Sequence, residues 1–131
     1  MEPYRTTLPL DSKERKGYPM FSGLLKYFPA ALAEVSRVSQ IGNDKHNPGE
    51  ELHHARGKSM DHEDCIIRHT VDAADLAAAS KVNPELREAV IFEKAQRAWR
   101  DLADLQQTIE MVRGVPMAPG ARAEVNKQEV K

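Results

Sequence analysis

The stretch PELREAVIFEKAQRAWRDLADLQQTIEMV, residues 84–112, decides the fold of this chain. Apolar and small residues recur along it in steps of three and four, which is the period of an α-helix. They are Ile91, Ala95, Ala98, Trp99, Leu102, Leu105, Ile109 and Val112. Asn83 and Pro84 form a cap and a first-turn proline, which predicts that the helix begins there. The stripe predicts packing against another helix, in the same chain or in a partner.

Two further helices are predicted on the N-terminal side of this stretch. Over 21–40 the apolar residues again follow a helical period, and Pro29 predicts a division into a short turn and a longer helix that begins near it. Over 60–79 the alanine-rich end favours a helix, with Ser59 as the expected N-cap. No stretch alternates with a period of two, so no sheet is predicted. The expected fold class is therefore all-α, a helical bundle with long central helices.

The flanks differ from this helical centre in composition. Residues 1–19 are polar with three prolines and are expected to form an extended N-terminal arm. Residues 114–131 are rich in Gly, Pro and charge and are expected to be a flexible C-terminal tail, which leaves 20–113 as the domain. Within it, 41–59 is predicted to be a long loop. Loops beyond about 12–15 residues are usually functional or disordered, and we interpret this polar one as functional.

Composition limits the classes of function. The 131 residues make one domain, and a formal net charge of −1 gives no broad attraction for nucleic acid or an anionic membrane. Neither is expected as a partner. The single cysteine, Cys65, excludes a disulfide within one chain and favours a reducing cytoplasm. No apolar run has the roughly 18 residues that span a bilayer, and the N-terminus has no signal-peptide pattern.

The densest group of reactive side chains lies in KSMDHEDCIIRH, residues 58–69. Asp61 and Asp64 are three residues apart, so a helix would place them on one face, and Arg68 joins that face a turn later. Adjacent carboxylates repel each other, but they suit Mg²⁺, which takes a few carboxylates and completes its shell with water and phosphate. The alternative interpretation is a solvated acidic turn at the positive end of the helix.

One more carboxylate and several cations lie in or beside these segments. Glu34 is the only acid over 21–40, and it either pairs with Arg37 or faces a site. Arg and Lys bind phosphate through charge-assisted hydrogen bonds, so two cations that converge on the acidic cluster would favour a triphosphate ligand. The candidates are Lys26, Lys45, Arg56, Lys58 and Arg68.

Histidines suggest two other kinds of site. His62, Cys65 and His69 share one side of the predicted helix, which would suit zinc, but the paired ligand sets of known zinc sites are absent. The HED run at 62–64 is similar to the adjacent His-Asp pair of HD-type phosphohydrolases, with Glu63 placed between the two residues.

A family resemblance extends over roughly residues 17–110. The run FSGLLKYFPAALAEVSRVSQIGNDKHNPGEELHHARGKSMDHEDCIIRH and the helix AQRAWRDLADLQ resemble the phage-type dATP/dGTP diphosphohydrolase domain, a MazG-like all-α nucleotide pyrophosphohydrolase. GNDKHNPG, the KSxDHxD run and RH carry the resemblance. It implies a four-helix-type fold that works as a homodimer or homotetramer. It also implies Mg²⁺ or Mn²⁺ held by acids on two helices, and hydrolysis of a purine dNTP between its α and β phosphates.

The resemblance assigns catalytic and metal-binding roles to three acids. Asp61 and Asp64 match the second acidic motif, Glu-x-x-Asp, with Asp in the first place, and Glu34 matches the first acidic helix. The wider family has a Glu-Glu-x-x-Glu set, whereas Glu34 has no acidic neighbours at 30, 31, 37 or 38. The number of metals is therefore left open. A missing ligand would come from Glu63, Glu50 or Glu51.

Substrate contacts are assigned by charge and by hydrogen-bonding capacity. We expect Lys58 and Arg68 to hold the leaving pyrophosphate, and Lys26 is a further phosphate-binding candidate. The neutral sugar and base would be bound by Asn43, His46 and Asn47. In some phages this activity supplies dGMP to a pathway that replaces adenine by 2-aminoadenine in the genome. The resemblance allows that role, in the host cytoplasm.

Other functions stay open at this point. An HD-type phosphohydrolase would use His62 as a ligand and release triphosphate or inorganic phosphate. A non-catalytic helical interaction protein would use the 91–112 stripe and bind no metal, and a DNA-binding accessory protein is disfavoured by the net charge. A helix of about 28 residues is roughly 42 Å long, more than a small monomer needs. A homo-oligomer with this helix in its interface is therefore predicted.

Overall fold

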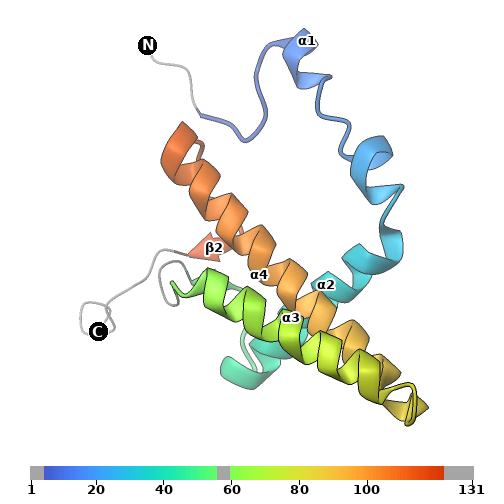
Figure 1. Ribbon diagram of the computed structural model, residues 1–131. Helices are drawn as coiled ribbons and strands as arrows, with labels where there is room; N and C mark the ends of the chain where they lie inside the picture. Colours follow the sequence, from blue (N-terminus) through green and yellow to red (C-terminus); the bar gives the residue numbers. More distant parts are fainter. Residues whose placement is uncertain (1–4, 56–59, 123–131) are drawn as a thin grey trace, which may run out of the picture.

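Three long helices form the centre of the protein, and the predicted all-α bundle is confirmed. The computed structural model describes residues 5–55 and 60–122, without the side chains of residues 54, 55 and 122. The helices are α2 (Pro29–His46), α3 (His62–Ala79) and α4 (Arg87–Arg113). Figure 1 shows α3 and α4 side by side in opposite directions, with α2 crossing behind α4. α4 is thus the element on which the other two pack.

Small residues let α3 and α4 approach each other. Ala73 of α3 and Ala95 of α4 are both buried. The turn between the helices contains the short 3₁₀ helix η2 (Pro84–Leu86), and the side chain of Asn83 accepts a hydrogen bond from the backbone N–H of Glu85 at 3.2 Å. The predicted start at Asn83 and Pro84 is therefore confirmed, with one 3₁₀ turn ahead of α4.

α2 begins as predicted but is longer than predicted. Pro29 stands in its first turn, where the missing backbone N–H costs nothing. The loop predicted over 41–59 is wrong in its first part, because α2 continues to His46. Gly42 alone does not stop the helix, since an interior glycine costs only about 1 kcal/mol. The helix stops where Pro48 restricts the backbone of the residue before it.

The absence of any sheet was also predicted wrongly. β1 (His54–Ala55) and β2 (Ala121–Arg122) pair in parallel, with His54 opposite Ala121. Two residues are too few to produce an alternating pattern, so the sequence carries no signal for them. The pair ties the chain after α2 to the chain after α4. Ser59, the expected N-cap of α3, lies outside the described residues, and Asp61 occupies the N-cap position without a side-chain capping bond.

Residues 5–28, called the N-terminal segment below, arch away from the three helices (Figure 1). The arm predicted as extended includes one helical turn, α1 (Ser12–Arg15), because the Asp11 carboxylate accepts a hydrogen bond from the N–H of Glu14. A π-helical turn, η1 (Phe21–Leu25), follows. At its start, the segment is fixed to the end of α4 by a 2.7 Å hydrogen bond from Arg5 Nη1 to the carbonyl of Gly114.

The core of the described chain is thin. Its buried apolar residues are Val35, Ala73, Ala95 and Ala103, and no large side chain of the described part is completely buried. Much of the predicted stripe on α4 is exposed, including Leu102 and Leu105. Among the described helices, none has both the length and the apolar character needed to cross a bilayer. The helices therefore meet mainly through small residues, and large apolar side chains remain in contact with water.

Candidate functional site

A pocket of about 730 Å³ lies where α2, α3 and α4 meet. Its volume falls within the range of small-molecule sites, roughly 300–1,000 Å³. Most of its polar lining carries no fixed charge: Ser39, Asn43, His46 and Asn47 from the α2 side, His62, Cys65 and His69 from α3, and Gln96, Trp99 and Gln107 from α4. Among the described residues of the lining, Arg100 is the one Lys or Arg, so this part of the pocket offers many hydrogen bonds and one fixed positive charge.

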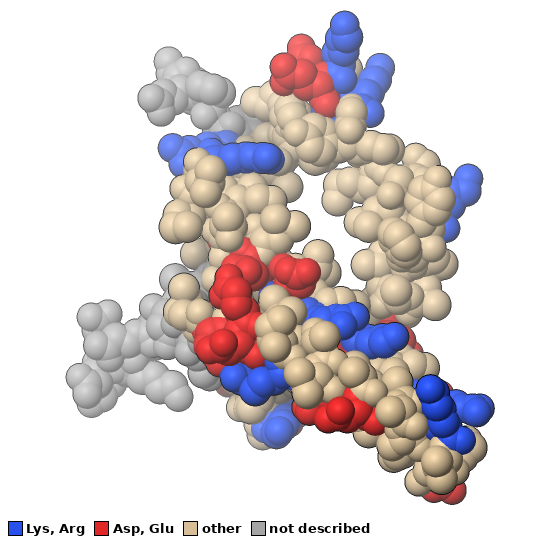
Figure 2. Space-filling view, in the orientation of Figure 1, with Lys and Arg blue, Asp and Glu red and all other residues tan. Residues whose placement is uncertain are grey.

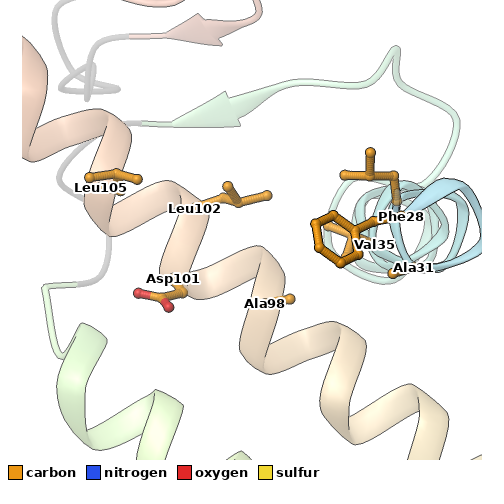
Figure 3. A pocket seen from close by; sticks show the side chains of 8 residues that line it. Phe28, Ala31, Val35, Ala98, Asp101, Leu102 and Leu105 are labelled. Carbon is orange, nitrogen blue, oxygen red and sulfur yellow. The ribbon is translucent and has the colours of Figure 1, made fainter. Parts of the chain in front are cut away.

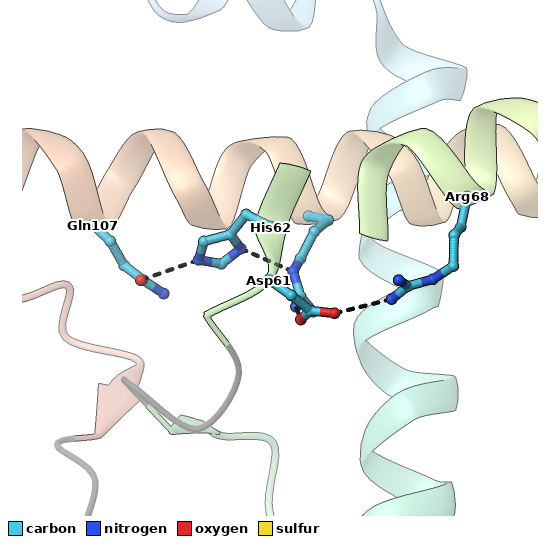
Figure 4. Close-up of polar contacts among 5 residues, drawn as sticks. Asp61, His62, Arg68 and Gln107 are labelled. Carbon is cyan, nitrogen blue, oxygen red and sulfur yellow. Dashed lines mark hydrogen bonds and ion pairs between the residues drawn. The ribbon is translucent and has the colours of Figure 1, made fainter. Parts of the chain in front are cut away.

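His62 is the buried centre of the polar contacts at this pocket (Figure 4). Arg100 donates from Nε to His62 Nδ1 at 2.8 Å, and His62 Nε2 lies 3.2 Å from Gln107 Oε1. A guanidinium can only donate, so Nδ1 must be the acceptor and Nε2 carries the hydrogen that it donates to Gln107. Both ring nitrogens are thus engaged, and the ring holds Arg100 in place.

Asp61 bridges two arginines rather than standing free beside Asp64. Its Oδ1 accepts a hydrogen bond from Arg100 Nη2 at 2.9 Å, and its Oδ2 accepts one from Arg68 Nη2 at 3.0 Å. The hydrogen bond with Asp61, together with the nearby negative charge, raises the pKa of Arg68 above its usual value. Asp61 is the N-cap residue of α3 rather than part of its first turn. Asp64 lies one turn before Arg68 on α3, as expected, and its negative charge contributes to the raised pKa of Arg68.

The other predicted acids lie apart from the pocket lining. Glu34 forms an exposed ion pair with Arg37 at 3.1 Å, while Glu63 and Asp64 are exposed on the first turn of α3. Within the described ranges, no three His, Cys, Asp or Glu side chains are grouped so that they could hold a metal ion. In the described structure Glu34 lies on α2, whereas Glu63 and Asp64 lie on α3, so these carboxylates are not gathered into one group.

The three residues assigned to sugar or base contacts do come together. Asn43, His46 and Asn47 all line the pocket. Asn43 is buried and donates from Nδ2 to the carbonyl of Glu50 at 2.9 Å, and Asn47 Nδ2 approaches Asn43 Oδ1 at 3.4 Å. These bonds fold the chain after α2 back onto the helix, so Asn43 has a structural role whatever it binds. His46 is exposed at the edge of the pocket.

The predicted cations that the structure describes lie in different places. Lys26 is exposed in the N-terminal segment and does not line the pocket. Lys58 and Arg56 lie outside the described residues, and Lys45 is exposed on α2. Of the described candidates, Arg68 reaches the polar cluster, through Asp61.

Sequence reasoning missed the contribution of α4. Gln96, Arg100 and Gln107 line the pocket, and Arg100 holds both His62 and Asp61. A signal was present, because these three polar residues are spaced by four and seven and so form a polar stripe beside the apolar one.

A second hollow, called the apolar groove below, runs between the first turns of α2 and the middle of α4. It has a volume of about 360 Å³ and is lined by Phe28, Ala31, Leu32, Val35, Ala98, Asp101, Leu102 and Leu105. Figure 3 shows Phe28 and Val35 facing Leu102 and Ala98 across this groove. Asp101 is the only charged residue among the described residues that line it, so the groove suits apolar side chains rather than a nucleotide.

Comparisons of the chain with family models, curated proteins and solved structures find no match. Support for a function must therefore come from the chemistry of the pocket and from the sequence resemblance.

Proposed function

We propose that this chain hydrolyses purine dNTPs, dGTP or dATP, to the monophosphate and pyrophosphate, with Mg²⁺ or Mn²⁺ as cofactor. The supporting observation is the 730 Å³ pocket, because it gathers Asn43, His46 and Asn47 beside the cation Arg100. A nucleotide needs this combination of neutral hydrogen-bonding groups for its base and positive charge for its phosphates. The reaction type and the metal requirement rest on the resemblance to the MazG-like enzymes.

The proposed roles follow from charge. A purine base is uncharged at neutral pH and is discriminated by hydrogen bonds, since a wrong base leaves polar groups unpaired. The phosphates carry several negative charges and can accept hydrogen bonds from guanidinium groups, as Asp61 does from Arg68 and Arg100. A bound triphosphate would therefore compete with Asp61 for these two arginines.

Product analysis with labelled dGTP in the presence of Mg²⁺ or Mn²⁺ tests the proposal. The expected products are dGMP and pyrophosphate. Release of triphosphate or inorganic phosphate would instead favour the HD-type reaction, although both ring nitrogens of His62 are engaged with Arg100 and Gln107. No turnover with either metal would contradict catalysis of this kind.

Two sets of variants locate the activity. Asp64→Asn is expected to abolish metal-dependent turnover, whereas the matched control Asp75→Asn, an exposed aspartate farther along α3, should retain it. Asn47→Ala should lower kcat/KM for the preferred purine dNTP far more than for a pyrimidine dNTP. A uniform fall for all substrates would mean that Asn47 shapes the site without contacting the base.

A second candidate is a non-catalytic helical interaction protein. The observation that favours it is the pairing of both Asp61 oxygens with arginines, which suits a structural carboxylate. Such a protein would bind its partner without turnover, so the product assay separates the two candidates. If turnover is found, assembly as a homodimer or homotetramer and a place in a phage 2-aminoadenine pathway are the further parts of the proposal.

A further inference from the structure

The N-terminal segment carries large apolar side chains that the described residues leave in water. Tyr18, Met20, Phe21, Leu24, Leu25, Tyr27 and Phe28 are all exposed, with Phe21 at 64% and Tyr27 at 73%. Figure 2 shows an opening between this segment and α4. The segment is held at its two ends, by Arg5 on Gly114 and by its junction with α2 at Pro29. Nothing among the described residues covers the stretch between.

The size of this surface matches a protein interface. The exposed fractions of the seven residues together equal nearly four complete side chains. At roughly 200 Å² for each large side chain, this is about 800 Å². One partner in a typical stable complex buries about 800 Å² as well. Exposed apolar patches on monomers are usually smaller, about 300–600 Å².

Each copy of the chain also has a surface that could receive the N-terminal segment of another copy. The apolar groove lies at the base of the segment, between α2 and α4, and its Leu102 and Leu105 are exposed. Residues 101–112 of α4 carry three acids and no Lys or Arg, whereas residues 5–28 carry five cations and two acids, a formal charge of +3. The N-terminal segment and the surface formed by the apolar groove and residues 101–112 are therefore both apolar in part, and their charges are opposite.

We propose that a second copy of this chain covers this surface. In the resulting two-fold dimer, the N-terminal segment of each copy packs into the apolar groove and against the acidic half of α4 of the other copy. Two such segments, each packed against the other copy, give an interface larger than about 2,000 Å² in total, in the range of obligate homodimers. The inference names the interface of the homo-oligomer proposed above, and it does not depend on catalysis. It adds the N-terminal segment to the interface, whereas the sequence analysis predicted an interface formed by the helix that is now α4.

Sedimentation equilibrium of the full chain tests the interface. The wild-type chain is expected to be a dimer at micromolar concentration. Phe21→Ser should raise the dimer dissociation constant roughly tenfold or more, the effect of a central interface side chain. Val82→Ser is the matched control, because Val82 is 90% exposed in the turn between α3 and η2. A monomeric wild-type chain, or equal effects of both substitutions, would overturn the proposal.

A mixing experiment separates segment exchange from other dimers. Phe21→Ser damages the segment, and Leu105→Ser damages the groove, so each variant alone is expected to dissociate. Mixed together, they can form a heterodimer that keeps one intact segment–groove contact, and the dimer fraction should rise severalfold. A mixture no more dimeric than its components would overturn the exchange. Circular dichroism, expected to equal that of the wild-type chain, checks that both variants keep their helices.

Discussion

Replacement of His62 by phenylalanine tests the polar cluster at the pocket directly. Phenylalanine keeps the size and planarity of the ring but removes both nitrogens. The Nε–H of Arg100 then loses its acceptor, and Gln107 loses the donor that now faces its Oε1. His62 is only 5% exposed, so water cannot easily replace these partners.

The magnitude follows from the two bonds. A hydrogen bond that involves a charged group contributes about 1.5–3 kcal/mol, and a neutral one about 0.5–1.5 kcal/mol. Phenylalanine regains part of this through its more apolar ring, so we expect a net loss of about 2 kcal/mol. For a chain of this length, such a loss lowers Tm by roughly 8 °C.

Urea denaturation followed by circular dichroism, at a fixed chain concentration, measures this loss. His46→Phe is the matched control, because His46 is an exposed histidine of α2, and a change below about 0.5 kcal/mol is expected. The double variant His62→Phe with Arg100→Leu should lose at least about 1 kcal/mol less than the sum of the single variants. Strict additivity would show that the ring does not bind Arg100 and would refute the reasoning.

Three further predictions concern stability. Asn43→Ala should cost about 1–2 kcal/mol and speed proteolysis of residues 47–53, because the bond to the Glu50 carbonyl is lost; unchanged cleavage would contradict this. Ala73→Leu should cost about 1–3 kcal/mol in urea denaturation, because Ala73 is 2% exposed between α3 and α4; equal stability would mean that the helices separate easily. Gly114→Ala should lower Tm by a few degrees in calorimetry, because Gly114 has a φ of 67° and an added Cβ would lie 3.1 Å from Arg5 Nη1. A neutral or stabilising alanine would contradict that assignment.

The sequence predicts the helices well because their signals are local. Pro29 and the Asn83–Pro84 pair act on the backbone beside them, so their positions do not depend on the rest of the fold. The end of α2 is different. Over 41–46 most residues are weak helix formers, and the contacts of α2 with α4 favour a helix that the local sequence does not predict. Non-local contacts of this kind leave no periodic trace in the sequence.

The site was harder to predict, because its contacts join residues far apart in the chain. Spacing correctly grouped Asn43, His46 and Asn47, which lie on one short stretch. Spacing could not reveal that Arg100 reaches back to Asp61 and His62, nearly forty residues earlier. Only the antiparallel pairing of α3 and α4 brings these groups together.

Because of the arrangement around Asp61, a phosphate could replace its carboxylate at Arg68 and Arg100 with little loss of stability. Asp61 is 47% exposed and the Arg68 side chain 63% exposed, and ion pairs this open to water contribute little to stability, about 0–1 kcal/mol. Arg100 differs, because its side chain is only 16% exposed and its Nε is held by the buried His62. If Asp61 swings toward water, Arg100 therefore keeps its position while its Nη2 hydrogen bond becomes available to another acceptor. The guanidinium of Arg100 then needs no rearrangement to bind a phosphate. Because that side chain is already ordered, binding a phosphate loses little conformational entropy there.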